Sequence, residues 1–174
     1  PFTIASANGA KGQIAFMIRG LGDYTKKLCE CAKVGMHATI YAPYGRFKRV
    51  SQAEREIWIG AGVGISPFIS WLQDPYAKDF EKATLVYCFT PSRAFPAPEE
   101  LQAMTKMRGA HFVGNVGGLD PLSETLRQAV TQTQPNKIHV SFCGPKGLLE
   151  KVHELMDINR IPKANLHFEL FEFR

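Results

Sequence analysis

Short apolar runs separated by helical stretches fill the chain from residue 54 onward. The apolar runs have the length of buried strands and cover residues 56–62, 83–90, 110–116, 137–144 and 165–173. Helix starts follow them at Ser66-Pro67, Pro98, Leu122 and Pro145. Strands that alternate with helices predict a doubly wound α/β domain, with a parallel sheet between two layers of helices.

The first fifty residues have a different pattern, in which three strand-like runs at 1–7, 13–20 and 37–42 surround one helix. Asp23 is a suitable helix cap, and the helix is expected to reach about Lys33. Three short strands cannot close a barrel. We therefore expect residues 1–50 to be the second half of a larger β-structure, and residues 51–174 to be the α/β domain. The start at Pro1, with no leader, predicts a fragment of a longer protein.

Composition narrows the class of protein. The chain has 174 residues, 45% of them hydrophobic and 21% charged, which is typical of a globular domain. The net charge of +5 is spread along the chain, with one small cluster at Arg46–Arg49, and this favours a solvated surface over a nucleic-acid site. The longest apolar stretch, 57–72, is interrupted by glycines, a proline and serines, so no membrane span is predicted.

Metal and triad chemistry are not expected. The four cysteines have irregular spacing and are interpreted as reduced thiols, and Cys29 and Cys31 would lie on different faces of a helix. The five histidines are dispersed and have no zinc-like spacing. Because no nucleophile motif or phosphate-binding P-loop appears either, the residues favour holding a cofactor over supplying acid–base groups.

The strongest local signal is the glycine-rich turn Gly60-Ala61-Gly62-Val63-Gly64-Ile65-Ser66-Pro67, which lies between a predicted strand and a predicted helix. Glycines allow a close backbone approach to a phosphate, and a helix N-terminus offers free N–H groups. Its spacing departs from the G-x-G-x-x-G dinucleotide fingerprint. A pyrophosphate site is favoured over a tight turn that simply requires small residues.

Two further turns are expected at the same rim of the sheet, because ligands in open α/β sheets bind beyond the carboxyl ends of the strands. Phe142-Cys143-Gly144-Pro145 follows the fourth strand, where a small thiol leaves room for a flat ring. A buried structural cysteine is the alternative. Ser92-Arg93 follows the second strand and suits a nucleotide 2′-phosphate, although a solvated loop pair explains it equally well.

The remaining signals are weaker. Gly22-Asp23-Tyr24-Thr25 precedes the first helix and offers an anion site, although helix capping by Asp23 explains it adequately. Phe168, Phe171 and Phe173 cluster on the last strand, where one face is expected to be buried and the other to cover a ligand.

In this order, the motifs resemble the ferredoxin–NADP reductase superfamily over essentially the whole chain. The likeness is greatest to bacterial ferric reductases, which are related to the NADPH oxidases. Pro1-Phe2-Thr3 resembles the end of the flavin motif His-Pro-Phe-Thr, and Gly22-Asp23-Tyr24-Thr25 with Leu28 resembles G-x-x-[ST]-x-x-L. Ala42-Pro43-Tyr44-Gly45-Arg46-Phe47 resembles the interdomain hinge, with Ala42 in place of the usual Gly, and Ser66 stands where the family has Thr.

The resemblance implies roles for individual residues. Residues 1–50 would be the C-terminal half of a flavin-binding antiparallel β-barrel, and Cys143 and Glu169 would shape the hydride pocket. The implied FAD and NADPH contacts, with NADH as a second nucleotide, are Phe2, Thr3, Gly22, Thr25, Tyr44, Gly60, Gly62, Val63, Gly64, Pro67, Ser92, Arg93, Gly144, Pro145 and Phe171.

The implied activity is an NAD(P)H:acceptor oxidoreductase, in which hydride passes to FAD and electrons continue to a haem or ferric acceptor. The haem would belong to an upstream transmembrane domain of the same polypeptide, which would place this part at the cytoplasmic face of the membrane. The alternatives are a superoxide-producing NADPH oxidase-type domain, a soluble ferredoxin-type reductase, and a truncated nucleotide-binding module without turnover. A nucleic-acid partner is the least favoured, and no oligomeric state is predicted.

Overall fold

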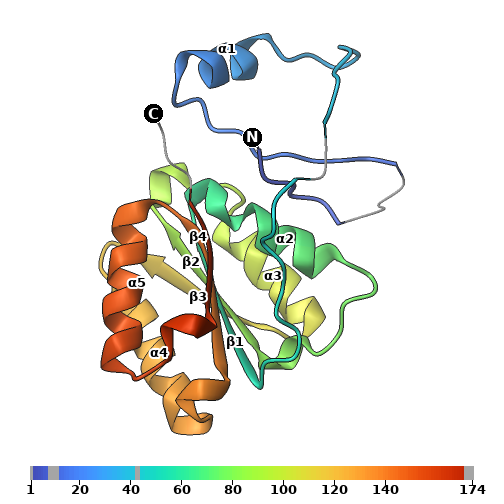
Figure 1. Ribbon diagram of the computed structural model, residues 1–174. Helices are drawn as coiled ribbons and strands as arrows, with labels where there is room; N and C mark the ends of the chain where they lie inside the picture. Colours follow the sequence, from blue (N-terminus) through green and yellow to red (C-terminus); the bar gives the residue numbers. More distant parts are fainter. Residues whose placement is uncertain (1, 8–11, 42–43, 171–174) are drawn as a thin grey trace.

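The computed structural model describes residues 2–7, 12–41 and 44–170. Its centre is a five-stranded parallel sheet in the order β3-β2-β1-β4-β5 (Figure 1). The strands are β1 (Arg55–Ala61), β2 (Ala83–Phe89), β3 (His111–Val116), β4 (Ile138–Gly144) and β5 (Leu166–Leu170). The predicted parallel α/β architecture is confirmed. Because the chain order reverses at β1, the point between β1 and β4 is the place where such sheets bind ligands.

The helices are α1 (Asp23–Cys31), α2 (Ser66–Gln73), α3 (Pro98–Arg108), α4 (Asp120–Gln132) and α5 (Lys146–Ile158). Short 3₁₀ turns precede or follow the strands: η1 (Gly62–Ile65), η2 (Phe80–Lys82), η3 (Pro91–Arg93), η4 (Pro135–Lys137) and η5 (Lys163–Asn165). None of the helices in the described ranges combines the length and the apolar character that crossing a bilayer requires.

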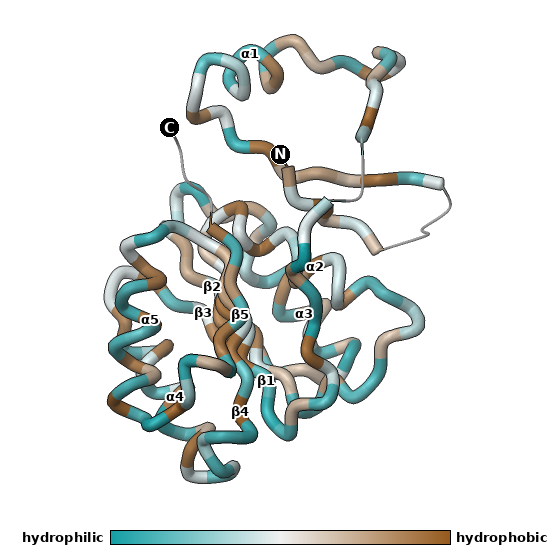
Figure 2. The backbone as a smooth tube through the Cα atoms, in the orientation of Figure 1, coloured by the Kyte–Doolittle hydropathy of each residue, from teal (hydrophilic) through white to brown (hydrophobic). Residues whose placement is uncertain are grey.

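Helices α2–α5 form two layers, one on each face of the sheet (Figure 1). Neighbouring residues of a strand point to opposite faces, so Ile57 and Ile59 join the cluster under α4 and α5, whereas Trp58 joins the cluster under α2 and α3. All three side chains are fully buried. The resulting apolar strands at the centre of the molecule are visible in Figure 2. Sheets with helices on both faces need such continuous apolar strands.

The described residues up to 50 are called the N-terminal part below, and most of them lie beyond the rim at which the strands end (Figure 1). The strands expected at 1–7, 13–20 and 37–42 are not formed in the described residues, where one isolated bridge joins Ile4 and Phe16. A strand needs a hydrogen-bonded neighbour along its length, and beside this bridge the two segments share one backbone bond, from Ala5 N to Ala15 O at 2.8 Å. The division of the chain at residue 50 stays a prediction.

The start of α1 also differs from the expectation. Gly22, rather than Asp23, is the N-cap residue, and Asp23 makes no capping hydrogen bond. The Thr25 hydroxyl instead accepts hydrogen bonds from the backbone N–H groups of Leu21 (3.0 Å) and Gly22 (3.1 Å). The helix ends at Cys31, two residues before the predicted end, and none of its residues is buried.

A buried ion pair fixes the start of the α/β domain. Arg49 binds Glu56 through two hydrogen bonds of 3.0 and 2.8 Å, and both side chains are nearly inaccessible to water. The guanidinium also donates to the carbonyl groups of Lys78 and Asp79 and lies 4.3 Å from the centre of the Phe80 ring. Two-point contact and stacking on an aromatic ring are interactions that arginine makes and lysine does not.

Candidate functional site

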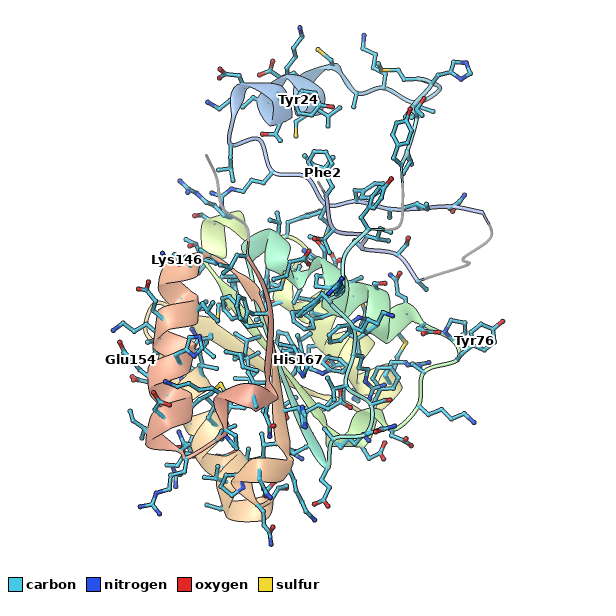
Figure 3. All side chains as sticks on the ribbon, in the orientation of Figure 1. Phe2, Tyr24, Tyr76, Lys146, Glu154 and His167 are labelled. Carbon is cyan, nitrogen blue, oxygen red and sulfur yellow. The ribbon has the colours of Figure 1, made fainter. Side chains whose placement is uncertain are left out.

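A cleft of about 440 Å³ opens at the carboxyl ends of the strands. The residues that line it include Gly62 and Val63 from the turn after β1, Arg93 from the turn after β2, and Pro145 from the turn after β4. These are the three turns that the sequence predicts to share one rim, and the structure brings them to one cavity. Lys146, at the start of α5, marks the same end of the sheet in Figure 3.

The glycine-rich turn is shaped by close packing on one side and open space on the other. A Cβ added to Gly64 would lie 2.1 Å from the backbone oxygen of Cys143, a distance that no side chain tolerates. Gly62 has φ +54°, and a Cβ there would meet no atom within 4 Å. Gly64 therefore lets η1 approach the β4–α5 turn, while Gly62 leaves backbone exposed toward the cleft.

The other residues predicted in this turn are buried behind the lining of the cleft and stabilise the shape of the turn. Gly60 and Pro67 are buried, and Pro67 lies in the first turn of α2, where the missing proline N–H costs nothing. The Ser66 hydroxyl donates a 2.7 Å hydrogen bond to the Val63 carbonyl oxygen and so closes the turn. These three residues are structural supports of the cleft, and none of them lines it.

The charged groups among the described lining residues are the guanidinium groups of Arg19 and Arg93. No carboxylate belongs to this set. Ser92 is exposed in the same short turn as Arg93, but it does not line the cavity. A cleft that combines free backbone at Gly62 with positive side chains suits an anionic ligand such as a phosphate ester.

Residues at the end of β3 form a fourth wall, which was not among the turns predicted from the sequence. Gly117, Gly118 and Leu119 line the cleft together with Asn115. Asn115 is buried, accepts a hydrogen bond from Leu122 N (3.2 Å), and donates one to the Gly118 carbonyl oxygen (2.9 Å). The glycine pair between a predicted strand and a predicted helix was the available signal for this wall, whereas nothing local marks Arg19.

Cys143 and Glu169 are neighbours on adjacent strands. Their Cα atoms are partners in the β4–β5 register, and Cys143 is fully buried in the cluster under α2. Burial, with a smaller contribution from the Glu169 charge, raises the pKa of the Cys143 thiol well above its ordinary value. The thiol therefore stays protonated at neutral pH. Its neighbour Gly144 is also buried, and a Cβ added there would lie 2.9 Å from the Ala61 side chain.

A second pocket of about 310 Å³ lies beside β5, the edge strand of the sheet. Glu169 lines it with Arg46 and Phe47, and His167, labelled in Figure 3, is a further lining residue. Cys143 lines neither pocket, because its side chain is enclosed in the core. Phe171, predicted to border the flavin and the nicotinamide, lies outside the described residues.

The residues predicted to hold FAD lie in the N-terminal part and do not line either described pocket. Phe2 is 40% exposed and contacts Phe16 edge to face, and Tyr44 is 83% exposed. Thr3 is partly buried, Gly22 is exposed, and the Thr25 hydroxyl is engaged at the start of α1. Within the described ranges, no group of acidic, histidine and cysteine residues forms a metal site.

The cleft and its sheet define a nucleotide-type α/β domain, and comparisons with known proteins agree with this class. No protein-family model matches the chain. The ferredoxin reductase component of 3-ketosteroid-9-alpha-monooxygenase from Rhodococcus rhodochrous is 29% identical over 150 residues, which are 83% of this chain and 42% of that protein. The chain spans about half the length of the curated relatives it matches.

Solved structures give the same result for the fold. The FAD/NAD-binding domain of nitric oxide dioxygenase from Vibrio cholerae superposes with a TM-score of 0.76 at 18% identity, over 98% of this chain and 76% of that one. A Plasmodium falciparum ferredoxin–NADP⁺ reductase mutant in complex with 2′P-AMP gives 0.74 at 18% identity, with the same coverage of both chains. The chain therefore has the ferredoxin–NADP reductase fold, and its sequence is related to the reductase components of oxygenase systems. The more specific likeness to ferric reductases stays a prediction.

Proposed function

We propose that this chain is the pyridine-nucleotide part of a flavin-dependent NAD(P)H reductase, together with a portion of its flavin-binding part. The observation that carries the proposal is the cleft at the β1–β4 switch point, because glycine backbone and two guanidinium groups meet there. The redox chemistry would belong to the cofactors when they are bound: NAD(P)H would supply a hydride and FAD would accept it.

The residues of the chain would bind and orient the nucleotide and exclude water. The backbone of Gly62 and Val63, at the start of η1, suits the pyrophosphate, and the Arg93 guanidinium suits a 2′-phosphate. A related fold that holds 2′P-AMP supports the second assignment. Cys143 and Glu169 are proposed to shape the hydride pocket in different ways: Glu169 lines the second pocket directly, whereas the enclosed Cys143 side chain supports the β4–β5 pair from the core. The protonated, buried thiol of Cys143 is not available as a nucleophile.

Phe2, Thr3, Gly22, Thr25 and Tyr44 are proposed to contact the flavin cofactor, on the strength of their motifs. The exposed rings of Phe2 and Tyr44 are available for stacking on a flat ligand. In the Gly22–Thr25 turn, however, the Thr25 hydroxyl already accepts two backbone N–H groups. Its contribution is therefore expected to be the shape of the turn.

The binding experiment titrates the purified chain with NADPH and NADH and separately with FAD. Arg93→Gln is expected to weaken NADPH binding roughly tenfold or more and NADH binding much less, because a charge-assisted phosphate contact is lost. Lys27→Gln, an exposed change of the same charge on α1, is the control. Equal losses for the two nucleotides would refute the 2′-phosphate assignment, and no nucleotide binding by the unmodified chain would refute the function.

Two electron acceptors are proposed for the whole protein. The resemblance to ferric reductases favours a haem in an upstream transmembrane domain. The names of the curated relatives, a ferredoxin reductase component and a dioxygenase reductase subunit, favour an iron–sulfur or oxygenase partner. Spectra of the purified whole protein distinguish the two acceptors. A haem whose Soret band shifts on addition of NADPH supports the haem acceptor. NADPH-dependent reduction of an added [2Fe–2S] ferredoxin by a haem-free protein supports the iron–sulfur partner.

A further inference from the structure

One residue that lines the nucleotide cleft comes from outside the sheet domain. Arg19 precedes β1 by more than thirty residues, yet its side chain lines the same cavity as Arg93 and Gly62. Every other lining residue comes from the carboxyl ends of the strands or from the turns and helix starts that follow them. The cleft is therefore completed from the N-terminal part, which lies over this rim (Figure 1).

Contacts on both sides fix the backbone that carries Arg19. On its N-terminal side, Met17 packs against the buried cluster that contains Trp58 and Phe68. On its C-terminal side, the backbone N–H groups of Leu21 and Gly22 donate to the Thr25 hydroxyl. Arg19 is thus held between the core of the sheet domain and the start of α1, although the side chain itself is exposed.

The charge of Arg19 has no obvious use in the fold. In the described part of the chain it forms no ion pair, and the lining residues of the cleft include no carboxylate. Two guanidinium groups in one cavity attract a ligand with more than one anionic group. A pyridine dinucleotide fits this description, because it carries a pyrophosphate and, in NADPH, a separate 2′-phosphate.

We propose that Arg19 is a second phosphate-binding residue of the nucleotide site, supplied by the N-terminal part. This inference rests on the proposed function and extends it: the nucleotide is held between two regions of the chain, with Arg93 on one and Arg19 on the other. Binding would then also tie the N-terminal part to the sheet domain.

The test uses two probes that each carry one kind of phosphate. ADP-ribose has the pyrophosphate without a 2′-phosphate, and 2′-AMP has the 2′-phosphate without a pyrophosphate. Calorimetric titration of the chain with each probe is compared for the unmodified protein, Arg19→Gln and the control Lys27→Gln. Loss of a charge-assisted phosphate contact is expected to weaken at least one probe by roughly tenfold in Arg19→Gln.

The outcomes are distinct. Weaker ADP-ribose binding assigns Arg19 to the pyrophosphate, and weaker 2′-AMP binding assigns it to the 2′-phosphate; both support the proposal. Affinities equal to those of Lys27→Gln for both probes overturn it, while leaving the proposed function intact. If the unmodified chain binds neither probe nor NADPH, the proposed function itself fails. If Arg19→Gln lowers the melting temperature, its affinities are compared with those of Arg19→Lys, which keeps the positive charge. Equal affinities of Arg19→Gln and Arg19→Lys for both probes would again overturn the proposal.

Discussion

The N-terminal part and the sheet domain are built in opposite ways. In the described residues up to 50, Ala5 and Ala7 are the buried apolar positions, while Val34 is fully exposed and Tyr24 is 71% exposed. Residues 55–170 contain both apolar clusters and all five strands. The sheet domain therefore has a core of its own, whereas the N-terminal part depends on a few contacts with that domain and is expected to open first.

The largest effect is expected at the point along the chain where the N-terminal part ends and the sheet domain begins. Arg49→Met leaves the Glu56 carboxylate buried without its ion-pair partner, with the Trp58 indole N–H as its one remaining bond among the described contacts. Removal of one partner of a buried pair costs about 3–5 kcal/mol. Urea unfolding is expected to show a loss of this size in the free energy of unfolding of the sheet domain.

The double variant Arg49→Met/Glu56→Gln provides the control. The neutral amide still accepts from the Trp58 indole, so we expect it to recover at least about 1 kcal/mol of the loss. If the single and double variants are equally unstable, the cost comes from lost packing of the arginine and not from an unpaired charge.

A matched pair of leucines tests the contrast directly. Leu126 on α4 is fully buried, whereas α1, which carries Leu28, has no buried residue. Leu126→Ala is expected to lower the free energy of unfolding by about 2–5 kcal/mol, because it leaves a cavity in a close-packed core. Leu28→Ala is expected to cost less than about 1 kcal/mol. Comparable losses in chemical denaturation would mean that α1 belongs to the same cooperative unit.

The glycine turn offers a comparison within the cleft itself. Gly64→Ala would place a methyl group 2.1 Å from a backbone oxygen that cannot rotate away, so we expect a loss of about 3 kcal/mol in the free energy of unfolding. In Gly62→Ala the added methyl group meets no neighbour. The expected loss in the free energy of unfolding is about 1 kcal/mol, because alanine disfavours the left-handed backbone of this position. Thermal unfolding measures both. A larger loss in Gly62→Ala would contradict the close approach between η1 and the β4–α5 turn.

Much of the sheet domain could be predicted from sequence because its signals are local. The apolar runs of β1 and β4 and the proline-started helices are local signals for these elements. Because β1 and β4 are parallel neighbours, the turns at Gly62 and Pro145 lie side by side at one rim. The prediction of strands before residue 50 was wrong because strand formation depends on a neighbouring segment and not on a local signal alone. Alternation alone does not make a strand when no neighbour completes its hydrogen bonds.

The parts of the site that were missed depend on contacts between distant segments. Arg19 lines the cleft only because Met17 is packed on the Trp58 cluster and the start of α1 is tied by Thr25. No spacing in the sequence records this arrangement. Conversely, Cys143 was predicted to shape a ligand pocket, and its complete burial depends on how α2 packs over β4, which local sequence does not specify.

The smallest effect is expected at His139, which is stacked on His167 with ring centres 5.9 Å apart. The pKa of His139 is lowered, first by burial and then by the nearby His167, while Glu56 acts in the opposite direction. In the unfolded chain the histidine pKa returns to about 6.5. Below that value the unfolded chain binds a proton that the folded protein resists, so stability falls as the pH decreases from about 6.5 toward the folded-state pKa.

His139→Gln removes this contribution, and exposed His37→Gln in the N-terminal part is its control. Between pH 8 and pH 5.5 the unmodified protein is expected to lose a few tenths of a kcal/mol more than His139→Gln, a small amount because water screens the partly exposed pair. Urea unfolding at the two pH values gives the difference, and an NMR titration of the His139 ring gives its midpoint directly. A midpoint at or above 6.5 would show that the ring is not shielded, and would remove this distinction between the packed sheet and the exposed N-terminal part.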